Sequence, residues 1–418
     1  MSDDDLRALE RAITGPEDAE GRIRYARALE RSGRRDEALD ALLPARGDPR
    51  ARAEIGKYPA WDSAVSGASR PHFLDVQPIR KNPRLAWVMD DPRRGLEILP
   101  AEVRPPYVVT PLALVSSWAG HGTALDPATG EVLWARDVPH TLNFVVRGEH
   151  LFWLALDGLE VRDIFTGEVM ARHPLPGGPG GLIVLGTRLA IHGRGETAVF
   201  ELAEPLGAPR ELWRAPGLAF PATRDEIVLV TSAPPRFEQS LARVVDVRTG
   251  SERSRLEKTR QNWVWLADEE LVVLQGDDGY HAYERDGRLR WSVLERGIYF
   301  ATRTERLVLT PEVGRRGLPP AEARLLRIDR ATGEVATLRR GPFARVAPVI
   351  ARDVFHAVER QSPAPVIAAF TLEGKPLWRL ELGELEGLSV NSLAVLHGGI
   401  VGVTHGEGGR VFRIVGDP

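Results

Sequence analysis

Histidine has the most versatile chemistry of any side chain here at neutral pH, because it can transfer a proton or bind a metal ion. The ten histidines are scattered along the 418 residues, at His72, His121, His140, His150, His173, His192, His281, His356, His397 and His405. None of them forms an HExxH or an HxH pattern. We interpret them as ordinary loop and strand residues. The functional alternative is a histidine and carboxylate set lining a channel, since His192 and His405 each lie beside a glycine where a strand is predicted to end.

Other chemistry-bearing patterns are missing or weak. The sequence contains no cysteine, which excludes thiolate nucleophiles, disulfides and thiolate metal sites, and it contains no GxSxG elbow. The glycine-rich residues 177–181 precede a strand pattern, so they lack the helix N-terminus that would bind phosphate. Asp277, Asp278 and Gly279 lack the ligand spacing of a calcium loop and fit a turn better. We therefore expect no catalytic, cofactor-binding or metal-binding residues.

The elements that would position any site begin with a helical segment over residues 1–58, which is rich in Ala, Leu, Arg and Glu. Its spacing resembles one tetratricopeptide (TPR-like) helix pair at Tyr25, Ala26, Leu29, Gly33, Ala38 and Leu39. Such repeats stack to bury a core, so a single copy favours a short helical cap on the next domain. A peptide-binding superhelix is the alternative. Residues 59–106, rich in Pro, Arg and Asp, predict a linker that contributes a closing strand.

Residues 107–418 show short alternating apolar runs separated by turns, which is typical of an all-β domain. A unit like residues 123–138, TALDPATGEVLWARDV, recurs about every 40 residues, with turn glycines at Gly130, Gly167, Gly207, Gly250, Gly287, Gly333 and Gly374. In each turn an Asp can accept backbone hydrogen bonds, and the Gly can adopt a positive φ. The tryptophans that follow are expected to wedge between neighbouring units, and they are Trp134, Trp213, Trp291 and Trp378.

Four short strands repeated with this period predict a β-propeller. LDPATGEVLW, at residues 125–134, resembles the LDxxTGxxLW hairpin of the quinoprotein-type, or PQQ-like, propeller repeat. The resemblance covers residues 107–418 and implies blade packing. Seven hairpins are visible, and three further strands follow Trp378 without an outer partner, which residues 72–100 could supply. We predict eight four-stranded blades, with seven as the alternative, and a small α-helical N-terminal module.

The resemblance also raises the possibility of dehydrogenase chemistry, because quinone-dependent dehydrogenases share this propeller. In that family a disulfide between adjacent cysteines packs on the quinone, and Glu and Asn hold a calcium ion. This chain has no cysteine and is shorter than those enzymes. We therefore expect no PQQ and no other cofactor.

Candidate binding residues lie in long loops. In a propeller, the loops between second and third strands share a face with the inter-blade loops, and three of them are long, at residues 232–240, 311–323 and 359–365. Inserts clustered on one face often mark a binding surface. The candidate partner-binding residues there are Arg236, Phe237, Arg315, Arg316, Arg339, Arg340, Phe343 and Arg360. Arginine suits bidentate contact with carboxylates and phenylalanine suits apolar anchoring, whereas arginines that merely solvate the loops are the alternative.

These features favour a non-catalytic scaffold over an enzyme: a propeller platform that docks protein partners with acidic surfaces in a larger bacterial assembly. The outer-membrane assembly lipoprotein built on this propeller is a precedent by resemblance. A net charge of −3 disfavours nucleic acid as a partner. The sequence has no run of 18 apolar residues and no signal-peptide pattern, so we expect a cytoplasmic protein without a membrane contact. The alternative is a hydrolase, lyase or small-ligand binder with a metal or ligand in the central channel.

Overall fold

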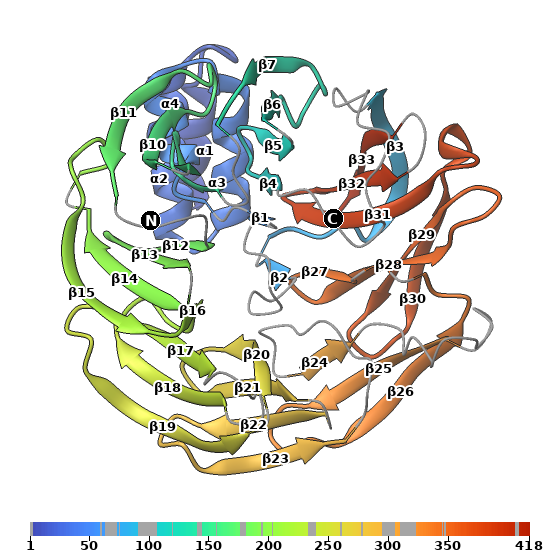
Figure 1. Cartoon of the computed structure of the whole chain (residues 1–418). Helices are drawn as coiled ribbons and strands as arrows, with labels where there is room; N and C mark the ends of the chain where they lie inside the picture. Colours follow the sequence, from blue (N-terminus) through green and yellow to red (C-terminus); the bar gives the residue numbers. More distant parts are fainter. Residues whose placement is uncertain are drawn as a thin grey trace.

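The computed structural model is a ring of β-sheets with a group of helices against one of its faces (Figure 1). It describes residues 3–58, 61–62, 73–74, 76–90, 107–118, 120–139, 144–155, 157–175, 181–193, 195–202, 204–232, 240–259, 261–276, 279–294, 306–309, 323–344, 346, 348–405 and 409–418. The mainly β class predicted from the sequence is confirmed.

The first described residues form a helical module, residues 3–58. Its elements are α1 (Asp3–Arg11), α2 (Ala19–Arg31), α3 (Arg35–Leu42), a 3-10 turn (Leu43–Ala45) and α4 (Pro49–Ile55). Asp18 and Asp48 begin α2 and α4, and their carboxylates accept hydrogen bonds from the backbone amides of Gly21 and Arg50 at 2.9 and 2.8 Å. Buried alanine and leucine side chains from α2 and α3 pack between the helices.

Eight sheets form the blades, which we number in chain order. Blades 1 to 4 are β4 (Tyr107–Val109), β5 (Leu114–Trp118), β6 (His121–Leu125) and β7 (Val132–Asp137); β8 (Phe144–Arg147), β9 (His150–Ala155), β10 (Gly158–Asp163) and β11 (Val169–Pro174); β12 (Gly181–Leu185), β13 (Arg188–Gly193), β14 (Glu196–Glu201) and β15 (Arg210–Pro216); and β16 (Leu218–Pro221), β17 (Glu226–Ser232), β18 (Ser240–Asp246) and β19 (Glu252–Thr259).

The remaining blades continue around the ring (Figure 1). Blades 5 to 8 are β20 (Gln261–Ala267), β21 (Leu271–Gly276), β22 (Tyr280–Glu284) and β23 (Leu289–Val293); β24 (Arg306–Leu309), β25 (Ala323–Asp329) and β26 (Val335–Gly341); β27 (Val349–Ala351), β28 (Val354–Arg360), β29 (Val366–Thr371) and β30 (Pro376–Glu381); and β31 (Ser389–Leu396), β32 (Gly399–His405), β33 (Arg410–Asp417) and β3 (Lys81–Asp90). Within each blade these strands pair antiparallel in this order. The prediction of eight blades is confirmed.

Aspartate and glycine shape the hairpins between third and fourth strands. In blade 1 the Asp126 carboxylate accepts from the amide of Ala128 at 2.6 Å, and Gly130 has a φ of 79°. The equivalent glycines of blades 2, 4, 5, 6 and 7 also have positive φ, as predicted. Gly207 of blade 3 is an exception: it has no positive φ, and its amide donates to the Glu204 carbonyl at 3.1 Å. The prediction of a left-handed turn at Gly207 is therefore wrong.

Tryptophan joins one blade to the next. The Trp134 Nε1 of blade 1 donates to the Ile164 carbonyl of blade 2 at 2.8 Å. A Cβ added to Gly167 would lie 2.7 Å from the Trp134 ring, so the turn glycine provides the flat surface on which the indole packs. The same relation links Trp87 to Gly130, Trp213 to Gly250 and Trp291 to Gly333. The expected wedging of tryptophan between blades is confirmed.

Blade 8 closes the ring with two distant segments. β3 pairs antiparallel with β33 at the outer position of the blade. Where the other blades have a hairpin, the Arg80 amide donates to the Asp417 carbonyl at 2.8 Å, and the Asn82 side chain donates to the Asp417 carboxylate at 2.6 Å. Trp378 of blade 7 donates to the Ile79 carbonyl at 2.8 Å, so this junction replaces the missing turn.

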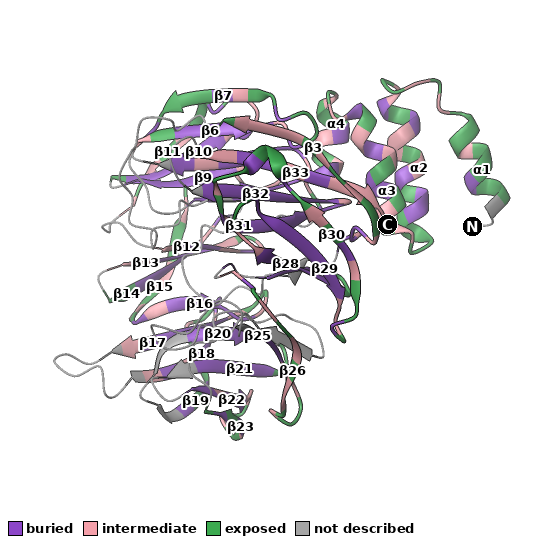
Figure 2. Ribbon diagram, turned by 90° about the vertical axis from the view of Figure 1, so that its right-hand side faces the viewer, coloured by how far each residue is buried: buried purple, intermediate pink, exposed green. Residues whose placement is uncertain are grey.

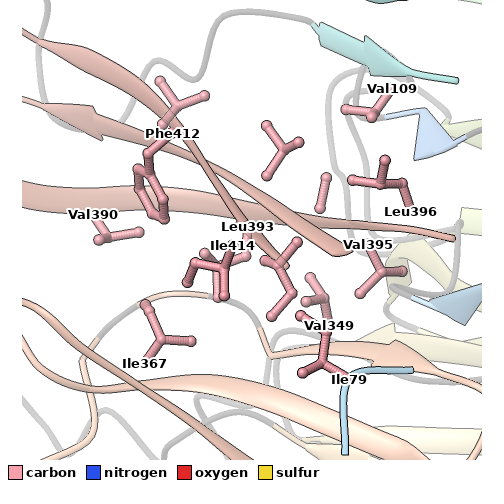
Figure 3. Close-up of a cluster of buried hydrophobic side chains, with 14 of the residues drawn as sticks. Ile79, Val109, Val349, Ile367, Val390, Leu393, Val395, Leu396, Phe412 and Ile414 are labelled. Atoms are coloured by element: carbon pink, nitrogen blue, oxygen red, sulfur yellow. The ribbon is translucent and has the colours of Figure 1, made fainter. Parts of the chain in front are cut away.

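Buried residues are concentrated in the strands of the blades (Figure 2), and their side chains form hydrophobic clusters between neighbouring blades. The largest cluster joins blades 7, 8 and 1 (Figure 3), where Leu393 and Ile414 of blade 8 meet Val349 of blade 7 and Val109 of blade 1. Ile79, which precedes β3, also lies in this cluster. Buried aliphatic side chains thus reinforce the closing blade on both sides.

Candidate partner-docking surfaces

Strand direction decides whether the candidate partner-binding residues share one face of the ring. Second and fourth strands run the same way across a blade, so β28 and β26 end on the same face of the ring. Arg339 and Arg340 lie at the end of β26, Arg360 ends β28, and Phe343 follows β26. The structure therefore places four of the candidate residues on one face of blades 6 and 7. The other four, Arg236, Phe237, Arg315 and Arg316, lie outside the described residues.

The surroundings of these four residues differ. Phe343 is only 4% exposed, and its ring centroid lies 6.2 Å from that of Phe370, so the prediction that it is an exposed anchor is wrong in this structure. Arg339 lies over the Phe370 ring at 5.1 Å. The Arg360 Nη2 is 2.7 Å from the Glu381 carboxylate. Arg340 is exposed and, of the four, is the side chain best placed to meet a partner.

The helical module covers part of the opposite face, where the turns after first and third strands lie (Figure 2). Its polar contacts reach four consecutive blades. These are Asp36 to Arg352 of blade 7 at 2.8 Å, Asp40 to His397 of blade 8 at 2.9 Å, Arg46 to Asp126 of blade 1 at 3.1 Å and Arg52 to Glu149 of blade 2 at 3.2 Å. Sequence reasoning missed these residues, although Asp36 and Asp40 are one helical turn apart and therefore share a face.

Apolar contacts accompany these polar contacts. Leu112, in the turn between β4 and β5, is 3% exposed and packs in the same cluster as Ile55 and Tyr58 of the module. The Arg52 guanidinium lies 4.3 Å from the Phe165 ring centroid in blade 2. The module is thus packed against the ring and does not extend from it.

The ring axis contains two short strands from the segment before β3 (Figure 1). β1 (Trp61–Asp62) pairs antiparallel with β4, the innermost strand of blade 1. β2 (Phe73–Leu74) pairs parallel with β27, the innermost strand of blade 7. Because first strands run toward the helical face, the chain enters the axis from that face at β1 and returns toward it at β2. Part of the inner wall on which a channel site would depend is therefore covered by the chain itself.

Two histidines lie in environments that disfavour protonation. Burial lowers the pKa of His192 to about 4 and the pKa of His356 to about 3. His356 is 1% exposed, with its ring centroid 5.6 Å from that of Trp378 between blades 7 and 8. The His192 ring packs over Gly181, where an added Cβ would lie 2.2 Å from it. Across the described parts of the chain, no three histidine or acidic side chains come together as a metal site.

None of the described helices has the length and apolar character that crossing a bilayer requires. No protein-family model matches the chain, and no curated protein sequence matches it significantly.

Solved structures share the fold. BamB from Moraxella catarrhalis matches with a TM-score of 0.51 and 10% identity, over 80% of this chain and 100% of that one. The quinohemoprotein alcohol dehydrogenase from Comamonas testosteroni matches with a TM-score of 0.55 and 13% identity, over 91% of this chain and 84% of that one. The quinohemoprotein alcohol dehydrogenase ADHIIG from Pseudomonas putida HK5 matches with a TM-score of 0.52 and 12% identity, over 88% and 82%. At these identities the likeness establishes the fold alone. The chain is an eight-bladed β-propeller with the fold of the PQQ-like, quinoprotein-type propellers.

Proposed function

We propose that the chain is a non-catalytic scaffold of the bacterial cytoplasm, which docks a protein with an acidic surface on the face where second strands end. The observation that carries this proposal is the placement of the helical module. Its contacts go to the turns of the opposite face, over blades 7, 8, 1 and 2. The chain also lines part of the axis with its own strands β1 and β2. Because the module lies on the opposite face, we expect the partner protein to bind on the face that carries the long loops.

The chemistry of that face favours an acidic partner. Arg340 is exposed, and Arg339 is held by Phe370 so that its guanidinium loses less freedom on binding. Arg360 is paired with Glu381, so it would exchange one carboxylate for another. A propeller is a rigid support for such a surface, because its blades are locked to one another through the tryptophan contacts.

The test is affinity purification of the tagged protein from its native host, followed by mass spectrometry and metal analysis, and then by binding measurements with the purified partner. Arg340→Glu and the double variant Arg315→Glu/Arg316→Glu should each weaken binding about tenfold or more. The affinity of the unaltered protein should also fall with added salt. Arg24→Glu, on the exposed side of α2, is the matched control and should bind normally. A chain that carries near-equimolar metal or a small ligand and no partner would contradict the scaffold and favour the channel enzyme.

A further inference from the structure

The ring closes at a blade assembled from two distant parts of the sequence. β3 and β33 are separated by about 320 residues, yet they pair in blade 8. The seam between blade 8 and blade 1 is made by two side chains. Trp87 of β3 donates from Nε1 to the Pro127 carbonyl of blade 1 at 3.2 Å, and Arg413 of β33 donates to the same carbonyl. No hairpin joins β3 to β33, so non-covalent contacts alone hold these two strands together in blade 8.

The helical module lies across this closing blade. Asp36 and Asp40 contact blades 7 and 8, before the seam to blade 1, and Arg46 and Arg52 contact blades 1 and 2, after it. Asp126, the partner of Arg46, belongs to the same turn as Pro127, on which Trp87 and Arg413 converge. A rigid helical module attached to blades on both sides of this seam resists separation of blade 8 from blade 1.

The contact is close at its blade 2 end. Gly56, at the end of α4, approaches Gly148 of blade 2 so tightly that a Cβ on Gly56 would lie 2.8 Å from the Gly148 Cα. Gly56 has an ordinary helical φ of −62°, so alanine would fit its backbone and would be opposed only by the propeller. Ile55, its neighbour in the chain, is fully buried in one cluster with Leu112 of blade 1. The module is therefore held on the propeller by close packing as well as by charged contacts.

We infer that the helical module is an intramolecular clasp, a single helical-repeat unit whose binding surface is occupied by its own propeller and which holds the ring closed at blade 8. The module is covalently tied to β3, so its effective concentration at the propeller face is high and its modest contacts suffice. This role is independent of whether the opposite face docks a partner.

The experiment is hydrogen exchange, followed by mass spectrometry, on the full chain. In Gly56→Ala the amides of β3 (81–90) should exchange roughly tenfold faster, because local opening of blade 8 becomes easier, while the amides of β21 (271–276) should keep their protection. Gly47→Ala is the matched control, since nothing lies within 4 Å of its added Cβ, and it should leave β3 protected.

A second set of variants tests the charges and does not depend on crowding. Arg52→Glu should also speed the exchange of β3, and the swap Arg52→Glu/Glu149→Arg should restore its protection. Arg50→Glu, on the same helix but paired locally with Asp48, should have no effect. The clasp is refuted if α4 loses protection while β3 keeps it, or if β3 and β21 lose protection equally. It is also refuted if neither Gly56→Ala nor Arg52→Glu changes the exchange of β3.

Discussion

Acid should destabilise this propeller through its buried histidines, His192 and His356, and His356 has the larger shift. Its imidazole is sealed between blades 7 and 8, and burial lowers its pKa from 6.5 to about 3. In the unfolded chain the same side chain titrates at its ordinary pKa. Below pH 6.5 the unfolded state therefore binds a proton that the folded state does not, and the free energy of unfolding falls as the pH falls, until about pH 3.

The magnitude follows from the two pKa values. Each pH unit between them is equivalent to about 1.4 kcal/mol, so lowering the pH from 7 to 5 should remove about 2 kcal/mol through His356 alone. That amount is a large part of the stability that folded domains usually have.

The assay is urea unfolding followed by tryptophan fluorescence at pH 7 and pH 5. In His356→Phe the loss between the two pH values should be smaller than in the unaltered protein by about 2 kcal/mol, whatever the variant's stability at pH 7. His121→Gln is the control, because the His121 side chain is 62% exposed, and it should keep the full pH dependence. Equal losses in His356→Phe and the unaltered protein would refute the reasoning.

Two further predictions concern a contact between blades 3 and 4 and a buried ion pair within blade 2. Gly250→Ala and Gly195→Ala both put alanine at a positive φ, which costs about 1–2 kcal/mol. Of these two glycines, only Gly250 lies against a tryptophan ring. The free energy of unfolding, measured with denaturant, should therefore fall by about 1–3 kcal/mol more in Gly250→Ala. Equal losses would show that the indole contact is unimportant. Arg162→Met should cost about 3 kcal/mol, because it removes the buried guanidinium that pairs with Glu160, which is 5% exposed, and leaves that carboxylate only the exposed guanidinium of Arg172. The same assay should show little change for Arg255→Met, whose side chain is 57% exposed, and similar losses in the two variants would contradict this account.

The parts of the fold that are encoded locally could be predicted from the sequence. A hairpin such as that of blade 1 is set by Asp126 and Gly130, four residues apart, so its pattern is readable wherever it recurs. The tryptophan wedges were also predictable from their spacing, but the glycine that receives each one belongs to the next blade and is identified only in the structure. Gly207 departs from the pattern, because its unit is degenerate in sequence and its turn has another conformation.

The candidate surface was less predictable, because burial is a tertiary property. Phe343 comes shortly after two arginines and looks like a loop residue, yet it is buried in a cluster that includes Phe370. Arg360 gains Glu381 from a strand 21 residues away in the sequence. The strands β1 and β2 have only two residues each and depend on the edges of blades 1 and 7, so no local pattern indicates them.

The pairing of β3 with β33 also constrains the order of events during synthesis. At about 5–20 residues per second, roughly 15–60 s separate the emergence of β3 from the ribosome and the completion of β33. During this interval β3 presents Leu85, Trp87 and Val88, which in the finished ring pack against the core of blades 7, 8 and 1. A strand in this condition can pair with the wrong edge or attract a chaperone. The nascent chain should therefore be most prone to aggregation just before its last blade is translated.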